Sequence, residues 1–191
     1  MTPPLDADLQ AKIEAAGRKA IEFRRQGFHC SESVFLAIND TLHLTDPAMV
    51  RLVTGFHGGG GTHRLRLDVN LTASLEAVAA GESPVAPGEA PFVQVGHLCG
   101  ALASGIVCMG FVHGRTTPAD DLTCVDELCF ELHRRFEEEF GARECRALRD
   151  RYVHSGQYPT CEFIYARGAQ LAVELLLTAP QWLPECRKNH P

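Results

Sequence analysis

The chain has 191 residues, of which 45% are hydrophobic and 22% are charged, and its formal net charge is −6. This length and composition are typical of a soluble globular protein with a sizeable core, and they exclude a disordered or fibrous chain. Because 18 basic residues stand against 24 acidic ones and only 7% of the residues are aromatic, we expect no nucleic-acid partner.

The first third of the chain predicts helices. Apolar residues recur at helical spacing over 6–26, Ser31 is a candidate cap for a second helix, and the segment 45–47 (TDP) is typical of a third helix start. Four glycines follow at 58–61, without the Gly-Lys-Ser/Thr of a phosphate-binding loop. We interpret them as a connector or as a place where the backbone approaches another group closely.

Residues 62–95 differ from their surroundings. Polar and apolar residues alternate over 64–71, which predicts a short strand, and a short helix is expected over 73–80. Three prolines mark 81–91 as a loop. We therefore expect 62–95 to be a loop and short-strand insertion in an otherwise helical body.

The segment after this insertion predicts a central helix over about 96–112. Residues 92–113 contain no Asp, Glu, Lys or Arg, but their glycines and polar side chains favour a buried helix over a membrane span. Small residues such as Gly100 and Gly105 permit close helix approach. We therefore predict no membrane insertion. Because such a small-residue helix must be covered on most sides and two-fold dimers are the commonest assemblies, we also predict a homodimer.

The remaining helices complete an all-α fold. The clearest amphipathic pattern covers 120–140, and shorter helices are expected over 143–150 and 161–177. The tail, about 180–191, is expected to be loose or strapped onto the surface. The sequence thus predicts a single domain over 1–191, a compact multi-helix bundle around the central small-residue helix with its core at about 6–177.

The chain begins without a recognisable export signal. Residues 1–6 (MTPPLD) show neither a basic segment followed by an apolar run nor a twin arginine. We therefore expect a cytoplasmic protein, in which metal binding or redox chemistry explains eight cysteines better than structural disulfides do.

Four of the cysteines lie at positions where the sequence indicates no chemical role. No two cysteines form Cys-x-x-Cys, which disfavours a thioredoxin-type dithiol or a zinc ribbon. Cys108, Cys124 and Cys129 lie in or beside apolar stripes and are expected to act as small hydrophobic residues. Cys186 lies in the tail and has no evident partner.

The other four, Cys30, Cys99, Cys145 and Cys161, all fall at predicted helix N-termini. There the helix dipole and free N–H groups stabilise a thiolate and are expected to lower the thiol pKa. Brought together, four such thiolates suit ligation of an iron–sulfur cluster. The alternative from the residues alone is that several merely begin helices and never meet.

The sequence around these cysteines resembles the C_GCAxxG_C_C redox-active protein family. The similar segments are 28–34 (FHCSESV), 99–104 (CGALAS), 140–148 (FGARECRAL) and 161–164 (CEFI), together with the glycine run after Phe56. The resemblance implies a small helical redox protein related to the iron–sulfur domain of split-Soret cytochromes c. Two features depart from the family pattern: Ser104 replaces a glycine, and 62–95 is longer than usual.

We predict that Cys30, Cys99, Cys145 and Cys161 bind an iron–sulfur cluster, 2Fe–2S or 4Fe–4S, and exchange electrons with a partner protein. Two alternatives remain open. One is a thiol–disulfide oxidoreductase that uses the same cysteines without a cofactor, and the other is a zinc or soft-metal binding protein.

Further residues are expected to surround the site. A histidine neighbour can replace a thiolate as ligand or donate a hydrogen bond to a cluster sulfur. The candidates are His29, His57, His63, Gly59, Gly60, His97 and Gly100.

Overall fold

The computed structural model describes residues 6–64, 92–94 and 97–189 and confirms the all-α fold class. Its elements, in chain order, are α1 (Ala7–Arg25), α2 (Cys30–Leu42), η1 (Pro47–Val50), α3 (Arg51–Thr54), η2 (His57–Gly59), β1 (Thr62–Arg64), β2 (Phe92–Gln94), α5 (Gly100–His113), α6 (Thr123–Phe140), α7 (Cys145–Arg149), η3 (Asp150–His154), α8 (Glu162–Trp182) and η4 (Pro184–Asn189).

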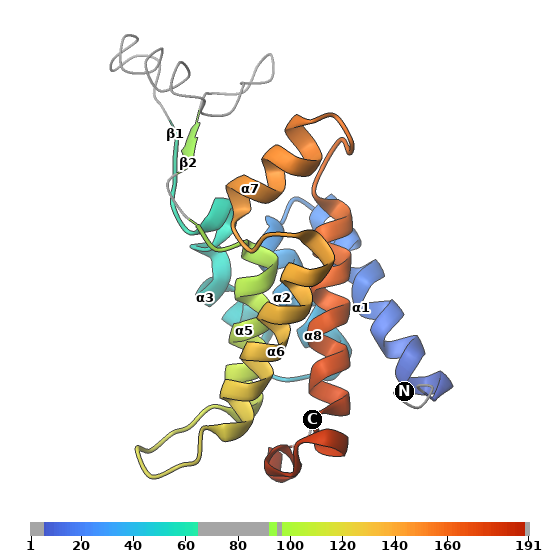
Figure 1. Cartoon of the computed structure of the whole chain (residues 1–191), viewed down its shortest axis with the longest axis vertical. Coiled ribbons are helices and arrows are strands. Elements are labelled where there is room, and N and C mark those ends of the chain that lie inside the picture. Colours follow the sequence, from blue (N-terminus) through green and yellow to red (C-terminus); the bar gives the residue numbers. More distant parts are fainter. Residues whose placement is uncertain (1–5, 65–91, 95–96, 190–191) are drawn as a thin grey trace.

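Two helices, α5 and α8, occupy the middle of the bundle (Figure 1). Helix α8 packs against α1, α2, α5 and α6, and α5 packs against α2, α6 and α8. The predicted central helix is therefore confirmed as α5, which begins at Gly100 instead of about residue 96 and shares its position with α8.

Glycines set the close approach of these central helices. A Cβ built on Gly105 of α5 would lie 2.7 Å from Leu132 Cδ2 and 3.3 Å from Ala172 Cβ. On the facing helix α8, a Cβ on Gly168 would lie 3.1 Å from Ala101 Cβ. The small residues of α5 therefore allow α6 and α8 to pack directly on its backbone.

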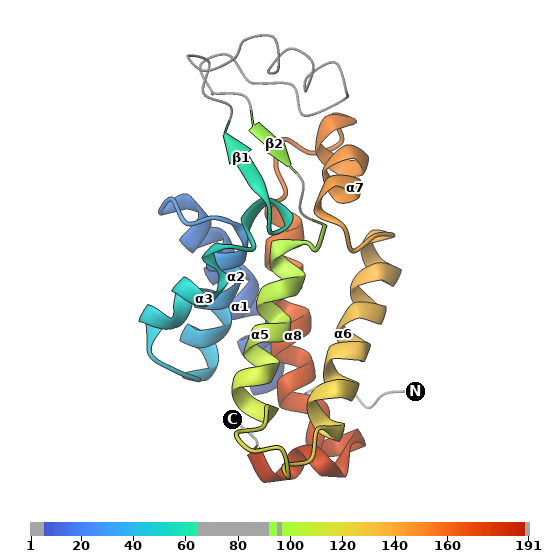
Figure 2. The same cartoon turned by 90° about the vertical axis from the view of Figure 1, so that its left-hand side faces the viewer.

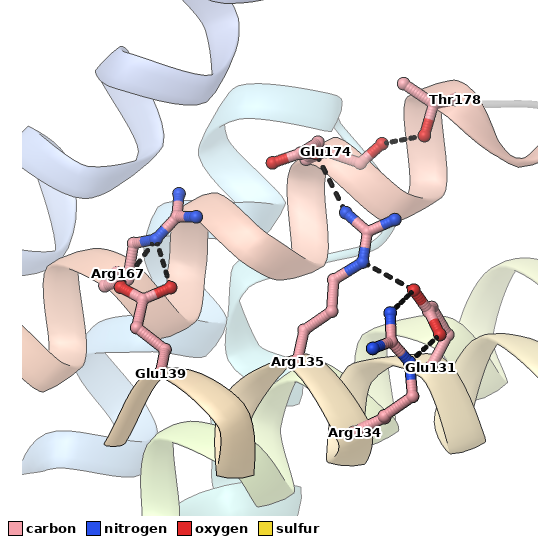
Figure 3. A network of polar contacts seen from close by, with 7 residues as sticks. All are labelled: Glu131, Arg134, Arg135, Glu139, Arg167, Glu174 and Thr178. Atoms are coloured by element: carbon pink, nitrogen blue, oxygen red, sulfur yellow. Dashed lines mark hydrogen bonds and ion pairs between the residues drawn. The ribbon is translucent and has the colours of Figure 1, made fainter. Parts of the chain in front are cut away.

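Ion pairs join the outer faces of α6 and α8 (Figure 3). Arg135 contacts Glu174 across the two helices at 2.9 Å and Glu131 within α6 at 2.7 Å, and Arg167 contacts Glu139 at 2.9 Å. Hydrogen bonds to Glu131 from Arg134, and then from Arg135, lower the pKa of that carboxyl to about 2. These partly exposed pairs orient α6 on α8 and add modestly to stability.

Only the two ends of the expected insertion are described. β1 pairs with β2 in an antiparallel hairpin with Thr62 opposite Gln94. The predicted strand over 64–71, helix over 73–80 and loop over 81–91 lie, apart from residue 64, outside the described residues.

Of the two expectations for the tail, the described structure favours a fastened segment over a loose one. Helix α8 continues to Trp182 instead of ending at residue 177, and η4 follows it. Within η4, Cys186 is fully buried and forms a disulfide with Cys124 near the start of α6. The C-terminal segment is therefore covalently fastened to the bundle.

None of the described helices is long and apolar enough to cross a membrane.

Candidate metal and redox site

The four candidate cysteines stand at the N-termini of four helices. Cys30 and Cys145 are the first residues of α2 and α7, and Cys99 and Cys161 are the N-caps of α5 and α8. Helices α5 and α8 begin at the end of the bundle that carries α7 and the hairpin (Figure 2). None of the four is disulfide-bonded; Cys99 and Cys145 are buried, and Cys30 and Cys161 are half-buried.

Three pairs of these cysteines lie close enough to interact electrostatically. Ionisation of Cys30 or Cys145 would raise the pKa of Cys99 further, and ionisation of Cys30 would raise that of Cys161. A Cβ built on Gly100 would lie 2.8 Å from Cys30 Sγ, so Cys30 packs against the residue that follows Cys99. We call Cys30, Cys99, Cys145 and Cys161 the four-cysteine site.

A short backbone pairing holds Cys99 and Cys145 beside each other. The Cys99 N–H donates to the Arg143 carbonyl at 2.9 Å, and the Cys145 N–H donates to the His97 carbonyl at 2.7 Å. Leu98 and Glu144 form the antiparallel bridge between these bonds. Because side chains alternate in extended backbone, Cys99 and Cys145 project to the same face of this bridge.

Backbone N–H groups point at the sulfurs. Gly58 and Ser31 donate backbone hydrogen bonds to Cys30, and Ala101 and Leu102 donate to Cys99. Gly58 has a φ of 65°, a conformation that glycine adopts without strain. The glycine run therefore makes the close backbone approach that the sequence left open, and its target is a cysteine sulfur.

The expected lowering of the thiol pKa values is wrong. Burial raises the pKa of Cys30, Cys99 and Cys161, and it raises that of Cys99 most. The N–H donors, Arg24 beside Cys30 and the Tyr165 hydroxyl beside Cys161 act in the opposite direction but do not offset it. The free-energy cost of moving a thiolate out of water exceeds the stabilisation that the helix N-terminus gives it here. These groups therefore stay thiols unless a cation binds them.

Ser104 fills the position where the family has glycine. It is fully buried, and its hydroxyl donates a 2.7 Å hydrogen bond to the Ser31 carbonyl of α2. The departure from the family pattern therefore adds a link between α5 and α2. Ser31 itself is fully buried beside Cys30, and its Oγ has no hydrogen-bond partner among the described residues. The Ser31 hydroxyl is therefore available to donate a hydrogen bond to an acceptor bound beside Cys30.

The candidate histidines separate into two places. The rings of His29 and His57 stack at 4.4 Å next to Cys30, and the His29 backbone N–H is capped by Glu32 at 2.8 Å. The side chain of His97 is exposed at a shallow pocket, and this residue enters the site through its backbone. His63 lies in β1, where only the backbone is described. Of the remaining candidate glycines, Gly59 is buried and Gly60 is exposed.

The remaining cysteines behave in two ways. Cys108 is fully buried in α5, and burial raises the pKa of half-buried Cys129 to about 11, as expected of packing residues. Cys124 and Cys186 are instead disulfide-bonded, which corrects their interpretation as separate hydrophobic and tail residues. Their separation of 62 residues hid the pairing, because the sequence gives no local signal for it.

Cys124, Cys186 and His113 form a group that can hold a metal ion once the Cys124–Cys186 disulfide is reduced. Their ligand atoms all lie within 4.8 Å of one another. Among the described residues, no other group of three or more His, Cys, Asp or Glu side chains meets that limit. No three sulfurs of the four-cysteine site meet that limit.

The fold and the two cysteine groups define a small helical protein with redox-active and metal-binding chemistry available to it. A family model described as "Putative redox-active protein (C_GCAxxG_C_C)" matches residues 84–175. The match confirms the resemblance over this part of the chain, which contains Cys99, Cys145 and Cys161 but not Cys30. No curated protein and no solved structure matches the chain.

Proposed function

We propose that the four-cysteine site ligates an iron–sulfur cluster and that the protein transfers single electrons to and from a partner protein. The observation that carries this proposal is that four cysteines outside the disulfide, each at a different helix start, are linked by electrostatic interactions in the pairs Cys30–Cys99, Cys99–Cys145 and Cys30–Cys161. When bound, such a cluster supplies reversible one-electron chemistry.

Three features of the chain support a cluster over a single ion. No three of the four sulfurs lie within 4.8 Å of one another, which suits thiolates bound to different irons. Backbone N–H groups of Gly58, Ala101 and Leu102 are available to the sulfurs, and such hydrogen bonds tune cluster potentials. The orphaned Ser31 hydroxyl is a further donor at the same place.

The first test is the spectrum of protein purified without oxygen. We expect a brown protein with visible absorption, iron and acid-labile sulfide in equal amounts, and a paramagnetic signal in one oxidation state. Stoichiometric zinc without visible absorption would instead support the zinc alternative. Metal-free protein that forms disulfides among the four cysteines would support the thiol–disulfide oxidoreductase.

The assembly is a second part of the proposal. We propose that one domain over 1–191 acts as a cytoplasmic homodimer, for which the large apolar side chains Leu52 and Phe111 offer exposed surface at 56% and 39%. Helices α3 and α5, which carry them, contact each other. Light scattering at tens of micromolar should give twice the chain mass of 20.9 kDa, and a monomer mass would overturn the dimer alone.

A further inference from the structure

A second set of soft ligands lies at the opposite end of the bundle from the four-cysteine site. His113 is the last residue of α5, Cys124 lies in the first turn of α6, and Cys186 lies in η4. Figure 2 shows these parts of the three elements together at the end away from α7. All three residues are buried, with exposed fractions of 5%, 6% and 0%.

We propose that His113, Cys124 and Cys186 form a Zn²⁺ site in the reduced protein and that the Cys124–Cys186 disulfide closes this site when the protein is oxidised. Two thiolates and one imidazole are a donor set that zinc accepts, with a water in the fourth position. Tetrahedral bonds of about 2.3 Å to sulfur and 2.1 Å to nitrogen place such donors roughly 3.6–3.8 Å apart. The present limit of 4.8 Å between the ligand atoms is compatible with that spacing.

The two states exclude each other because they use the same sulfurs. A dithiol reductant gives two electrons and two protons to the disulfide, becomes a disulfide itself, and leaves Cys124 and Cys186 as thiols. Zinc then displaces both thiol protons and binds the two thiolates and the imidazole. Exchange with an oxidised dithiol runs the sequence backwards: it re-forms the bond between the sulfurs and releases zinc.

The surrounding packing makes this exchange local. Element η4 packs against α5 and α6, so the three ligands stay close when the disulfide opens. The disulfide in the oxidised protein, or the bound zinc ion in the reduced protein, fastens the C-terminal segment to the bundle. The site is independent of the four-cysteine site, since the two share no residue.

The test compares zinc binding by matched variants. Protein reduced with a phosphine and then desalted anaerobically is titrated with Zn²⁺ against a chromogenic chelator. We expect the wild type and Cys129→Ser, a control on the same helix as Cys124, to bind one more equivalent than His113→Gln and Cys186→Ser. After oxidation of Cys124–Cys186 in the wild type, this extra equivalent should disappear. Equal zinc binding by all four reduced proteins would overturn the proposal.

A second measurement needs no variant. Reduced wild-type protein is alkylated with and without Zn²⁺, and the modified cysteines are mapped by mass spectrometry. We expect zinc to slow alkylation of Cys124 and Cys186 at least tenfold, and a chelator to restore the rate. Unchanged rates at both residues would overturn the site. Because the readout is specific to each cysteine, it holds whether the four-cysteine site carries iron, zinc or neither.

Discussion

Cys99→Ser is expected to reduce the iron and sulfide content of anaerobically purified protein by more than tenfold. Cys99 is buried, interacts with Cys30 and Cys145, and accepts backbone hydrogen bonds from the first turn of α5. A serine hydroxyl is a hard, weakly acidic donor that cannot replace a soft thiolate on iron. Absorption at visible wavelengths and metal analysis measure the loss. The same result is expected for Cys30→Ser, Cys145→Ser and Cys161→Ser.

Cys108→Ser is the matched control, because Cys108 lies in the same helix and is fully buried. It should keep the chromophore and lose only about 1 kcal/mol of unfolding free energy, as buried single substitutions commonly do. Loss of iron in Cys108→Ser with retention in any one of the other four variants would contradict the assignment of ligands. Cys124 and Cys186 are unsuitable as neutral controls, since removing their disulfide costs about 2–4 kcal/mol in oxidised protein.

The helix starts were predictable because their signals are local. Apolar spacing and local signals placed Cys30, Cys99, Cys145 and Cys161 at N-termini, and the structure has each of them within one residue of a helix start. The candidate cap Ser31 was wrong in detail, because the N-cap of α2 is His29 and Ser31 lies inside the first turn. The third helix start was likewise found from Asp46, whose side chain caps the Ala48 N–H at 2.8 Å. Such signals depend on neighbours two to four residues away, which the sequence displays directly.

The features that sequence reasoning missed depend on distant parts of the chain. The bridge between Leu98 and Glu144 involves segments too short to show a strand pattern. The thiol pKa values follow from burial, which is a property of the packed bundle, so the helix-dipole effect alone gave the wrong direction. The hydrogen bond from Gly58 to Cys30 could be anticipated only as an unspecified close approach.

The second large effect is expected from substitution of Gly100, because this residue lies where the start of α5 contacts α2. A Cβ at this position would lie 2.8 Å from Cys30 Sγ, 3.0 Å from the Phe56 carbonyl oxygen and 3.2 Å from Ser31 Cβ. The carbonyl belongs to the backbone that leads into the glycine run, so it cannot rotate away as a side-chain end would. The added methyl group must therefore push the start of α5 away from Cys30 and the glycine run.

Gly100→Ala is accordingly expected to lower the unfolding free energy by about 1–3 kcal/mol through overpacking and to reduce cluster occupancy several-fold. Gly110→Ala is its matched control in the same helix, since a Cβ there meets nothing within 4 Å. That change should raise the unfolding free energy by up to about 1 kcal/mol, because alanine is the better helix former. Denaturant unfolding gives the two free energies, and visible absorption gives the occupancy. If Gly100→Ala instead kept full occupancy and matched Gly110→Ala in stability, α5 would not need to approach Cys30 closely, and the four-cysteine site would tolerate a wider spacing than the structure has.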